Sequence, residues 1–364
     1  MTLYESIADL PLRVEEYELS LRERDTSSGF TRTTTVIELR GDDETGSGED
    51  VTYENEEHYA LREFHQRGDH ERLPLDGEYT FAEFSDLVAD LDLFPAGEPE
   101  RDDFRTYRRW GVESAALDLA LKQSGISLAD ALGRSCRPVR FVVSTRLGDP
   151  PTTERLDALR STDPNLEFKL DPVSAWTTAL IERVAETNAV RVLDLKGQYH
   201  GTEVDQPADP VLYRRLVESF PDALIEDPAL TEETRSVLSG HEDRVSWDYP
   251  ITGVESIETL AWEPSWINVK PSRFGSVRTL LETIEYCIEN EIRMYGGGQF
   301  ELEVGRNHIQ ALASLFYPDA PNDVAPSGYN DPEPSRDLPK SPLSPPDRSC
   351  DPPGFGWRAP DRSA

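Results

Sequence analysis

The chain has 364 residues, and 70 acidic against 37 basic side chains give it a formal net charge of −33. A chain this anionic repels nucleic acid and anionic lipid, so both classes of partner are excluded. The length suits one large barrel or a barrel with a smaller companion domain, and we expect two units.

The acidic residues are spread along the whole chain, and only five of the basic residues are lysines. This composition fits a protein dissolved in concentrated salt, where a short Debye length suppresses self-repulsion. We therefore expect the cytoplasm of a halophile. Intrinsic disorder would also explain high charge, but regular apolar runs from about residue 100 to 320 argue against it.

Neither a disulfide nor a membrane segment is expected. Cys136, Cys287 and Cys350 are odd in number and include no close pair. The N-terminal stretch has no basic region followed by an apolar one, and no apolar run approaches membrane-spanning length.

Residues 1–110 are expected to form an α+β capping domain, completed by closing segments from the C-terminus. Segments 12–24 and 31–41 alternate in polarity and predict an antiparallel pair joined by a polar turn. Residues 52–67 and 80–94 are helical by their period, and the chain is strongly helical again from residue 107.

Residues 111–330 alternate between apolar strand candidates and helical patterns. The strand candidates are 139–147, 166–172, 190–197, 223–229, 244–251, 266–274, 292–300 and 322–329. Units of this length imply parallel pairing, and seven or eight of them imply a closed (β/α) barrel of the α/β class. Residues 331–364 contain nine prolines and are expected to be extended or irregular, and Phe355 and Trp357 are candidates for docking this tail on the barrel.

Charged residues gather where these strands end, which is where a parallel barrel places its active site. They are Lys169, Asp171, Asp194, Lys196, Glu226, Asp227, Asp248 and Lys270. Because side chains alternate along a strand, Lys169 shares a face with Asp171, as Asp194 does with Lys196. Any single strand-end charge is equally well explained as a helix cap or a solvated loop residue. Gln198 and Tyr199 follow the third strand and are expected on the rim.

Three carboxylates on neighbouring strands suit a hard dication such as magnesium, and no histidine or cysteine cluster competes for a softer metal. Such an ion neutralises the charge that develops when a carboxylate substrate loses its α-proton. A lysine across the substrate can take that proton if nearby positive charge lowers its pKa.

The chain resembles the enolase superfamily, and within it the muconate-lactonizing and mandelate-racemase-like groups, over roughly residues 10 to 330. Segment 45–50, TGSGED, resembles the GxGE turn of the family's capping domain, and segment 111–133 resembles the helix and turn that lead into its barrel. LDLKG, IEDP, WDYP and NVKPSRFGS then follow in the family's order. The resemblance implies a (β/α)7β-type TIM barrel.

The resemblance also implies roles for individual residues. Asp194, Glu226 and Asp248 match the three magnesium ligands, and Lys270 matches the sixth-strand lysine that acts as acid or base. Glu301 resembles the glutamate that polarises or orients the intermediate. Segment 26–30 matches the capping loop that often selects the substrate, although a plain hairpin turn is the alternative.

Two positions depart from the family pattern. Asp171 stands where the second strand often has a second lysine, after Lys169, and Lys196 stands where the third strand commonly has asparagine. Either Asp171 serves as proton donor or relay and Lys196 supplies a cation, or the two residues pair across adjacent strands and only hold the pocket together.

One strong base and one acid fit β-elimination better than racemisation. We therefore expect a magnesium-dependent lyase or dehydratase that acts on a hydroxy or sugar acid through an enediolate, as a homo-oligomer in the cytoplasm. The alternatives are a racemase, epimerase or cycloisomerase of the same superfamily, a Schiff-base aldolase that uses Lys270, and a non-catalytic member.

Overall fold

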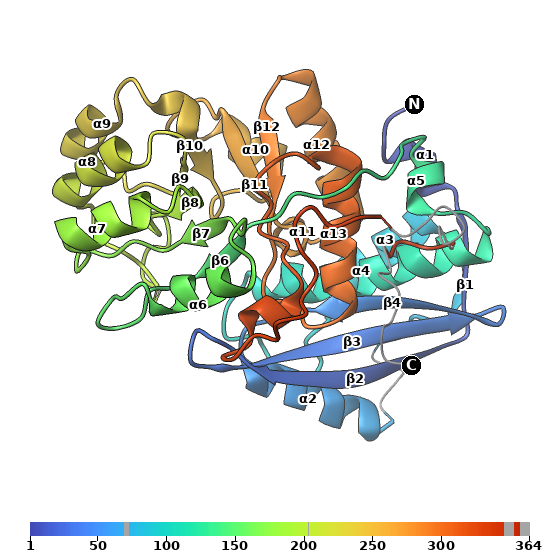
Figure 1. Ribbon diagram of the computed structural model, residues 1–364. Helices are drawn as coiled ribbons and strands as arrows, with labels where there is room; N and C mark the ends of the chain where they lie inside the picture. The colour runs from blue at the N-terminus through green and yellow to red at the C-terminus, as the bar shows by residue number, and fades with distance from the viewer. Residues whose placement is uncertain (69–72, 203, 346–352, 357–364) are drawn as a thin grey trace.

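The computed structural model describes residues 1–68, 73–202, 204–345 and 353–356. An antiparallel sheet and its helices lie on one side of the molecule, and a curved parallel sheet with outer helices lies on the other (Figure 1). The long helix α4 (Phe104–Gln123) runs between them.

The N-terminal part confirms the predicted antiparallel pair and both predicted helices. Its sheet has the order β2-β3-β4, and β1 pairs with β5 in a separate antiparallel ribbon. The elements are α1 (Glu5–Ala8), β1 (Pro11–Val14), β2 (Glu16–Asp25), β3 (Thr31–Gly41), β4 (Glu44–Asp50), α2 (Asn55–Gln66), β5 (Gly77–Thr80), α3 (Phe81–Asp90) and α5 (Leu128–Ala131).

The segment expected as a GxGE turn is instead the strand β4, so that prediction is wrong. A Cβ on Gly46 would lie 2.3 Å from the carbonyl oxygen of Ala115, and one on Gly48 would lie 2.0 Å from that of Gly111. The two glycines are needed because the backbone of α4 lies directly on this strand.

The C-terminal part contains one parallel sheet in the order β12-β11-β10-β9-β8-β7-β6. Its strands are β6 (Val143–Thr145), β7 (Phe168–Leu170), β8 (Val190–Asp194), β9 (Leu224–Glu226), β10 (Val245–Trp247), β11 (Trp266–Val269) and β12 (Arg293–Gly296). Its helices are α6 (Glu154–Thr162), α7 (Thr178–Ala185), α8 (Pro210–Ser219), α9 (Glu232–Leu238), η2 (Glu242–Arg244), α10 (Val254–Glu258), α11 (Pro271–Phe274), α12 (Val277–Glu289), α13 (Val304–Phe316) and η3 (Ser327–Asn330). The predicted alternation of strands and helices is confirmed.

The eighth strand expected at 322–329 does not form. Asn322 makes an isolated parallel bridge with Phe141, and Asp323 N donates a 2.7 Å hydrogen bond to the carbonyl of Gly296. These contacts join the two edges of the sheet without a regular ladder. Pro321 directly precedes the segment and Pro326 lies within it, and each lacks a backbone donor.

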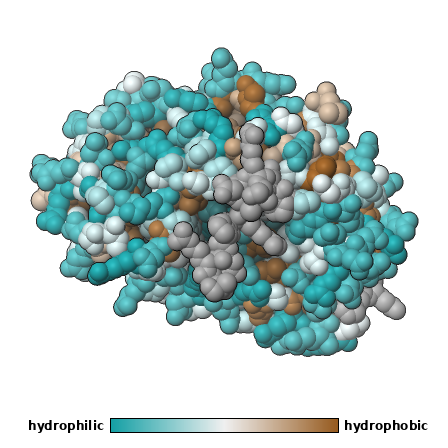
Figure 2. All heavy atoms as spheres, turned by 45° about the vertical axis from the view of Figure 1, so that its right-hand side comes forward, coloured by the Kyte–Doolittle hydropathy of each residue, from teal (hydrophilic) through white to brown (hydrophobic). Residues whose placement is uncertain are grey.

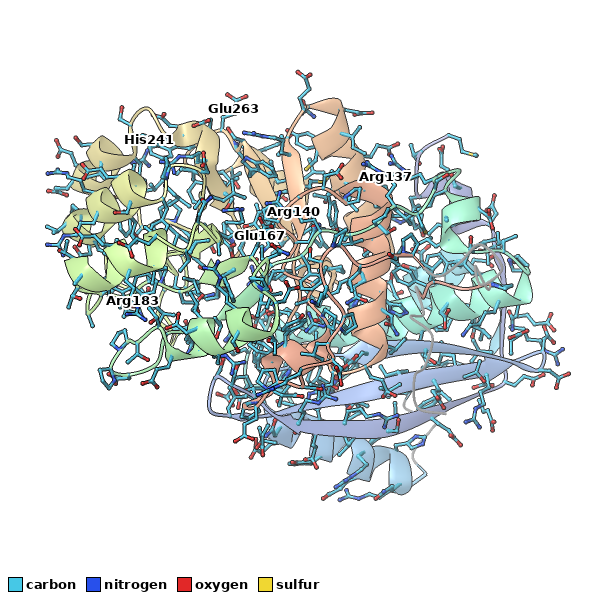
Figure 3. All side chains as sticks on the ribbon, viewed as in Figure 1. Arg137, Arg140, Glu167, Arg183, His241 and Glu263 are labelled. Carbon is cyan, nitrogen blue, oxygen red and sulfur yellow. The ribbon has the colours of Figure 1, made fainter. Side chains whose placement is uncertain are left out.

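The amino ends of the first strands hold a cluster of ion pairs. The carboxylate of Glu167 accepts hydrogen bonds of 2.6 and 2.8 Å from Arg140, and both residues are labelled in Figure 3. It also accepts a hydrogen bond of 2.7 Å from Arg191. This end of a barrel supports the fold, whereas the opposite, carboxyl ends of the strands form its site.

The described part of the C-terminal segment docks through Phe355, as the sequence suggested. Its ring is 2% exposed and stacks on His308, with ring centroids 4.1 Å apart and planes 7° apart. Phe355 N also donates to Asp118 on α4 at 2.9 Å. Trp357 and Cys350 lie outside the described residues.

The visible face in Figure 2 is mainly hydrophilic, in line with the composition. Among the described residues, the exposed large hydrophobic side chains are Met1, Phe30, Val211 and Ile288. A search of the same residues finds no helix long and apolar enough to cross a membrane.

Salt should stabilise this fold. The net charge of −33 opposes the compact state at low ionic strength, and the Debye length falls from about 10 Å at 0.1 M to about 3 Å at 1 M salt. We expect the midpoint of thermal unfolding, followed by circular dichroism, to rise between 0.1 M and 2 M KCl. Because screening depends on ionic strength, NaCl at the same concentrations should give a similar rise, and an unchanged midpoint in KCl would contradict the explanation.

His308 should make stability depend on pH. Burial lowers the pKa of this imidazole to about 4, and neither ring nitrogen has a hydrogen-bond partner. Since the unfolded chain binds a proton below about pH 6.5 and the folded chain does not, stability falls as the pH drops from 6.5 to 4.

The variant His308→Phe keeps the stacking partner of Phe355 and cannot titrate. Between pH 7 and pH 4 it should lose about 3 kcal/mol less unfolding free energy than the wild type, measured by urea denaturation. His58, which is also buried, is present in both proteins, so the difference isolates position 308. Equal losses in the two proteins would show that His308 is not the sensor.

Candidate active site

Three buried carboxylates meet at the carboxyl ends of β8, β9 and β10. Asp194, Glu226 and Asp248 are each 0% exposed, and each offers one carboxylate oxygen such that the three oxygens lie within 4.8 Å of one another. The parallel register pairs Asp194 with Glu226. Carboxylate oxygens are the ligands of hard dications, so this acidic triad can hold a metal ion.

Lys169 on β7 lies beside two of these carboxylates. Its Nζ donates a 2.5 Å hydrogen bond to Glu226 and lies 3.4 Å from Asp194 and 3.7 Å from Asp323. Burial alone would lower the pKa of Lys169, but the charge of Glu226 and then that of Asp194 raise it well above the ordinary value. Lys169 is therefore held as a buried ammonium group.

Lys196 follows β8 in a left-handed conformation, with φ of 53°. Its backbone N–H donates to Asp194 Oδ1 at 3.2 Å, and its Nζ contacts Asp194 Oδ2. The positive φ turns the chain back at the strand end, so the side chain returns to the preceding aspartate. Burial lowers the pKa of Lys196, but the charges of Asp171 and Asp194 outweigh it and raise the pKa well above its ordinary value.

Asp248 accepts hydrogen bonds from three side chains. They come from Lys270 Nζ at 2.9 Å, Arg273 Nη1 at 3.0 Å and the Tyr199 hydroxyl at 2.8 Å. Burial would raise the pKa of Asp248, but Arg273 and then Lys270 hold it well below its usual range. The rim position expected for Tyr199 is wrong, because this side chain is 9% exposed and points inward.

Among the three triad carboxylates, Glu226 is the one whose surroundings raise the pKa. Burial first, and then the charges of Asp194 and Asp248, raise its pKa well above the usual range, although Lys169 opposes this. The hydroxyl of Tyr295 donates to Glu226 Oε2 at 2.5 Å. A divalent ion at the triad would favour the ionised form of Glu226.

The adjacent Asp227 turns away from the triad. Its backbone has φ of 46°, and its carboxylate accepts the N–H groups of Asp248 and Tyr249, both at 2.8 Å. Burial, together with Asp248 and Asp194, raises the pKa of Asp227 to about 7. Asp227 thus positions the end of β10.

Asp171 and Lys196 do not form the ion pair that we considered. Asp171 Oδ2 lies 3.2 Å from Arg146 Nε, and Lys196 pairs with Asp194. Asp171 still influences Lys196, because its charge raises the pKa of that lysine.

Glu301 lies in the loop after β12, and its side chain is 4% exposed. Its Oε1 accepts the Gln299 N–H at 2.8 Å, and its Oε2 lies 3.5 Å from Arg306 without a hydrogen bond. The glycines of this loop permit close approach, since a Cβ on Gly298 would lie 2.1 Å from Glu301 Oε2 and one on Gly297 would lie 3.0 Å from Lys270 Cε. The loop therefore lies against both proposed catalytic side chains.

The cap reaches this same loop. The tip of the β2–β3 hairpin places Phe30 edge-on to Phe300, with ring centroids 5.5 Å apart, and Ser27 N donates to the carbonyl of Asn330 at 2.7 Å. The hydroxyl of Tyr53 donates to Gln299 Oε1 at 2.8 Å. Segment 26–30 is thus a hairpin turn in contact with the barrel loops.

Sequence reasoning assigned no role to several residues that contact the triad. They are Arg273, Tyr199, Tyr295 and Asn268. The sequence could have identified Asn268 as a site residue. It stands two positions before Lys270, so in a strand the two side chains lie on the same face. The other three reach the carboxylates from the short helix α11, the loop after β8 and strand β12, and no local pattern marks them.

A hollow of about 630 Å³ lies among the loops that follow β8, β9 and β10. Its lining includes Gly197, Trp247 and Arg235 but none of the three triad carboxylates. It is therefore separate from the cluster of charges just described.

Removing the Lys169 ammonium should destabilise the protein. The variant Lys169→Met leaves Glu226 and Asp194 with less compensation in a buried site, and breaking a buried pair costs about 3–5 kcal/mol. We expect a loss of this size in urea denaturation followed by fluorescence in EDTA. The control Lys340→Met changes an exposed lysine and should lose less than about 0.5 kcal/mol. Equal stability of the two variants would show that Lys169 is not needed to compensate the triad.

Comparison with known proteins places the chain in a family. Residues 5–131 and 135–331 match the N-terminal and C-terminal models of the domain of unknown function DUF8230. The o-succinylbenzoate synthase of Bacillus subtilis (strain 168) is 24% identical over 242 residues. This match covers 60% of the chain and 58% of that enzyme, so it spans less than two thirds of the relative's length.

Two solved structures show how far the fold is shared. An enolase superfamily member from Listeria innocua superposes on this chain with a TM-score of 0.65 and 22% sequence identity. The match covers 87% of this chain and 86% of the Listeria chain. Muconate cycloisomerase from Pseudomonas fluorescens has a TM-score of 0.62 and 19% identity, with coverages of 86% and 87%. The chain therefore belongs to the DUF8230 family, and its fold, a modified barrel with an N-terminal cap, is that of the enolase superfamily.

Proposed function

We propose that the chain is a magnesium-dependent enzyme that removes a proton α to the carboxylate of a small-molecule substrate. The observation that supports this most directly is the buried triad of Asp194, Glu226 and Asp248 with the amine of Lys270 beside it. They lie at the carboxyl ends of the strands, where barrels of this kind perform their chemistry.

Asp194, Glu226 and Asp248 would hold the ion. When bound, magnesium supplies positive charge that stabilises the negative charge developing on the substrate carboxylate. Oxygen-only ligands and the absence of histidine and cysteine from the triad fit magnesium better than a softer metal.

Lys270 is the proposed base, and its Nζ takes the α-proton. The side chain is buried, and the hydrogen bond to Asp248 and the contact with the Gly297 loop limit its orientation. In the neutral form, Nζ has a lone pair that can accept the proton.

Other residues around the triad contribute charge and orientation. Lys169 and Lys196 supply positive charge on the side of Asp194, and Glu301 orients or polarises the intermediate. Asp171 is the proposed donor or relay for the opposite face of the substrate, with Arg146 orienting its carboxylate.

The reaction class that fits these residues best is β-elimination, such as the dehydration of a hydroxy or sugar acid. Asp171 stands where the resemblance leads one to expect a second lysine, so in this proposal Lys270 works with an acid rather than with a second strong base. The match to o-succinylbenzoate synthase and the fold shared with muconate cycloisomerase make the substrates of these two enzymes the first to test. Cycloisomerisation is the second candidate, because muconate cycloisomerase shares this fold.

The test is the exchange of the substrate α-proton in deuterium oxide, followed by NMR across a library of carboxylic acids. Lys270→Ala should slow exchange by about 10²- to 10⁴-fold, since general base catalysis contributes that much. EDTA should abolish exchange and magnesium should restore it. Lys340→Ala, which changes an exposed lysine, should exchange like the wild type.

Three results would contradict the proposal in different ways. Retained exchange in Lys270→Ala would refute the base assignment. Borohydride trapping of a covalent adduct, with turnover unaffected by EDTA, would indicate a Schiff-base aldolase instead. No exchange with any acid in the library would favour a non-catalytic member.

A further inference from the structure

We infer that the ammonium group of Lys196 competes with the divalent ion for Asp194 and has to leave this carboxylate for the ion to bind. The inference rests on the metal site of the proposed function, and it identifies a residue that sets the strength of metal binding. It follows from the contacts of Lys196 and from the room around its side chain.

Lys196 engages both oxygens of Asp194. Its backbone N–H donates to Oδ1 at 3.2 Å, and its Nζ contacts Oδ2. The Nζ of Lys169 lies 3.4 Å from the same Oδ2. An ion that takes Asp194 as a ligand therefore meets an ammonium group already in contact with that oxygen.

Of these two lysines, Lys196 is the one with room to move. Its side chain is 15% exposed, whereas that of Lys169 is 2% exposed and also donates to Glu226. Lys196 Nζ lies 4.9 Å from the centroid of the Tyr199 ring, whose face attracts a cation.

Asp171 is the acceptor that we assign to Lys196 when it leaves Asp194. The charge of Asp171 acts on Lys196, and the Asp171 side chain is itself 15% exposed. Arg146, which pairs with Asp171, is 51% exposed and can remain solvated if Lys196 takes its place. The ammonium can thus move from Asp194 toward Asp171 and stay compensated.

The energetic consequence is weaker metal binding. A dication and an ammonium group at the same carboxylate repel each other, and moving Lys196 away also requires breaking its contact with Asp194. A neutral side chain at position 196 removes both costs.

The experiment measures Mn²⁺ binding to the purified full-length protein by electron paramagnetic resonance, which reports free Mn²⁺ without any substrate. Lys196→Gln should bind Mn²⁺ at least about tenfold more tightly than the wild type. Lys196→Arg keeps the charge and should bind within about threefold of the wild type. Asp194→Asn should abolish the site.

Folding is checked by circular dichroism, and Lys196→Met serves as a second neutral variant if Lys196→Gln does not fold. The inference would be overturned if the wild type binds Mn²⁺, Asp194→Asn abolishes this binding, and the folded neutral variant binds no more tightly than the wild type. The assignment of the metal site would still stand in that case. Absence of Mn²⁺ binding by the wild type and the neutral variants at millimolar concentration would refute both the inference and the magnesium dependence of the proposed function.

Discussion

The compensation of three buried carboxylates is the constraint on which the site depends. Asp194, Glu226 and Asp248 are fully buried, and ionised carboxylates without partners are strongly unfavourable in such surroundings. Four cationic side chains surround them. These side chains come from β7, the turn after β8, the end of β11 and helix α11. The register of the strands and the left-handed turn at Lys196 therefore place positive charge beside the buried carboxylates.

A single glutamate ties the cap to the loop that completes the site. Glu49 at the end of β4 is 0% exposed, and it accepts the N–H groups of Leu302 at 2.7 Å and Gly305 at 2.8 Å. Because Glu301 directly precedes Leu302, these hydrogen bonds connect the cap to the chain segment that carries Glu301. The glycines that let β4 lie on α4 therefore contribute to the geometry of a site formed by a different part of the chain.

Periodic patterns predicted the barrel and the charged residues at its strand ends, because parallel strands bring their carboxyl ends to one edge whatever the details of their loops. The resemblance to the enolase superfamily then singled out the triad among these residues. Contacts between distant segments could not be predicted in this way. The resemblance predicted a turn at segment 45–50, yet its glycines lie in a strand and allow helix α4 to pack directly on it. The inward direction of Tyr199 and the partner of Lys196 depend on loop conformations, including a positive φ at a residue other than glycine.

The burial of the lysines has a consequence for chemical labelling. Of the five lysines in the chain, Lys122, Lys169, Lys196 and Lys270 are at most 17% exposed at their side chains and are ion-paired, whereas Lys340 is exposed. An amine-directed reagent should therefore modify Lys340 and the N-terminus first. Slower modification of Lys196 would then report directly on how often its ammonium group is away from Asp194.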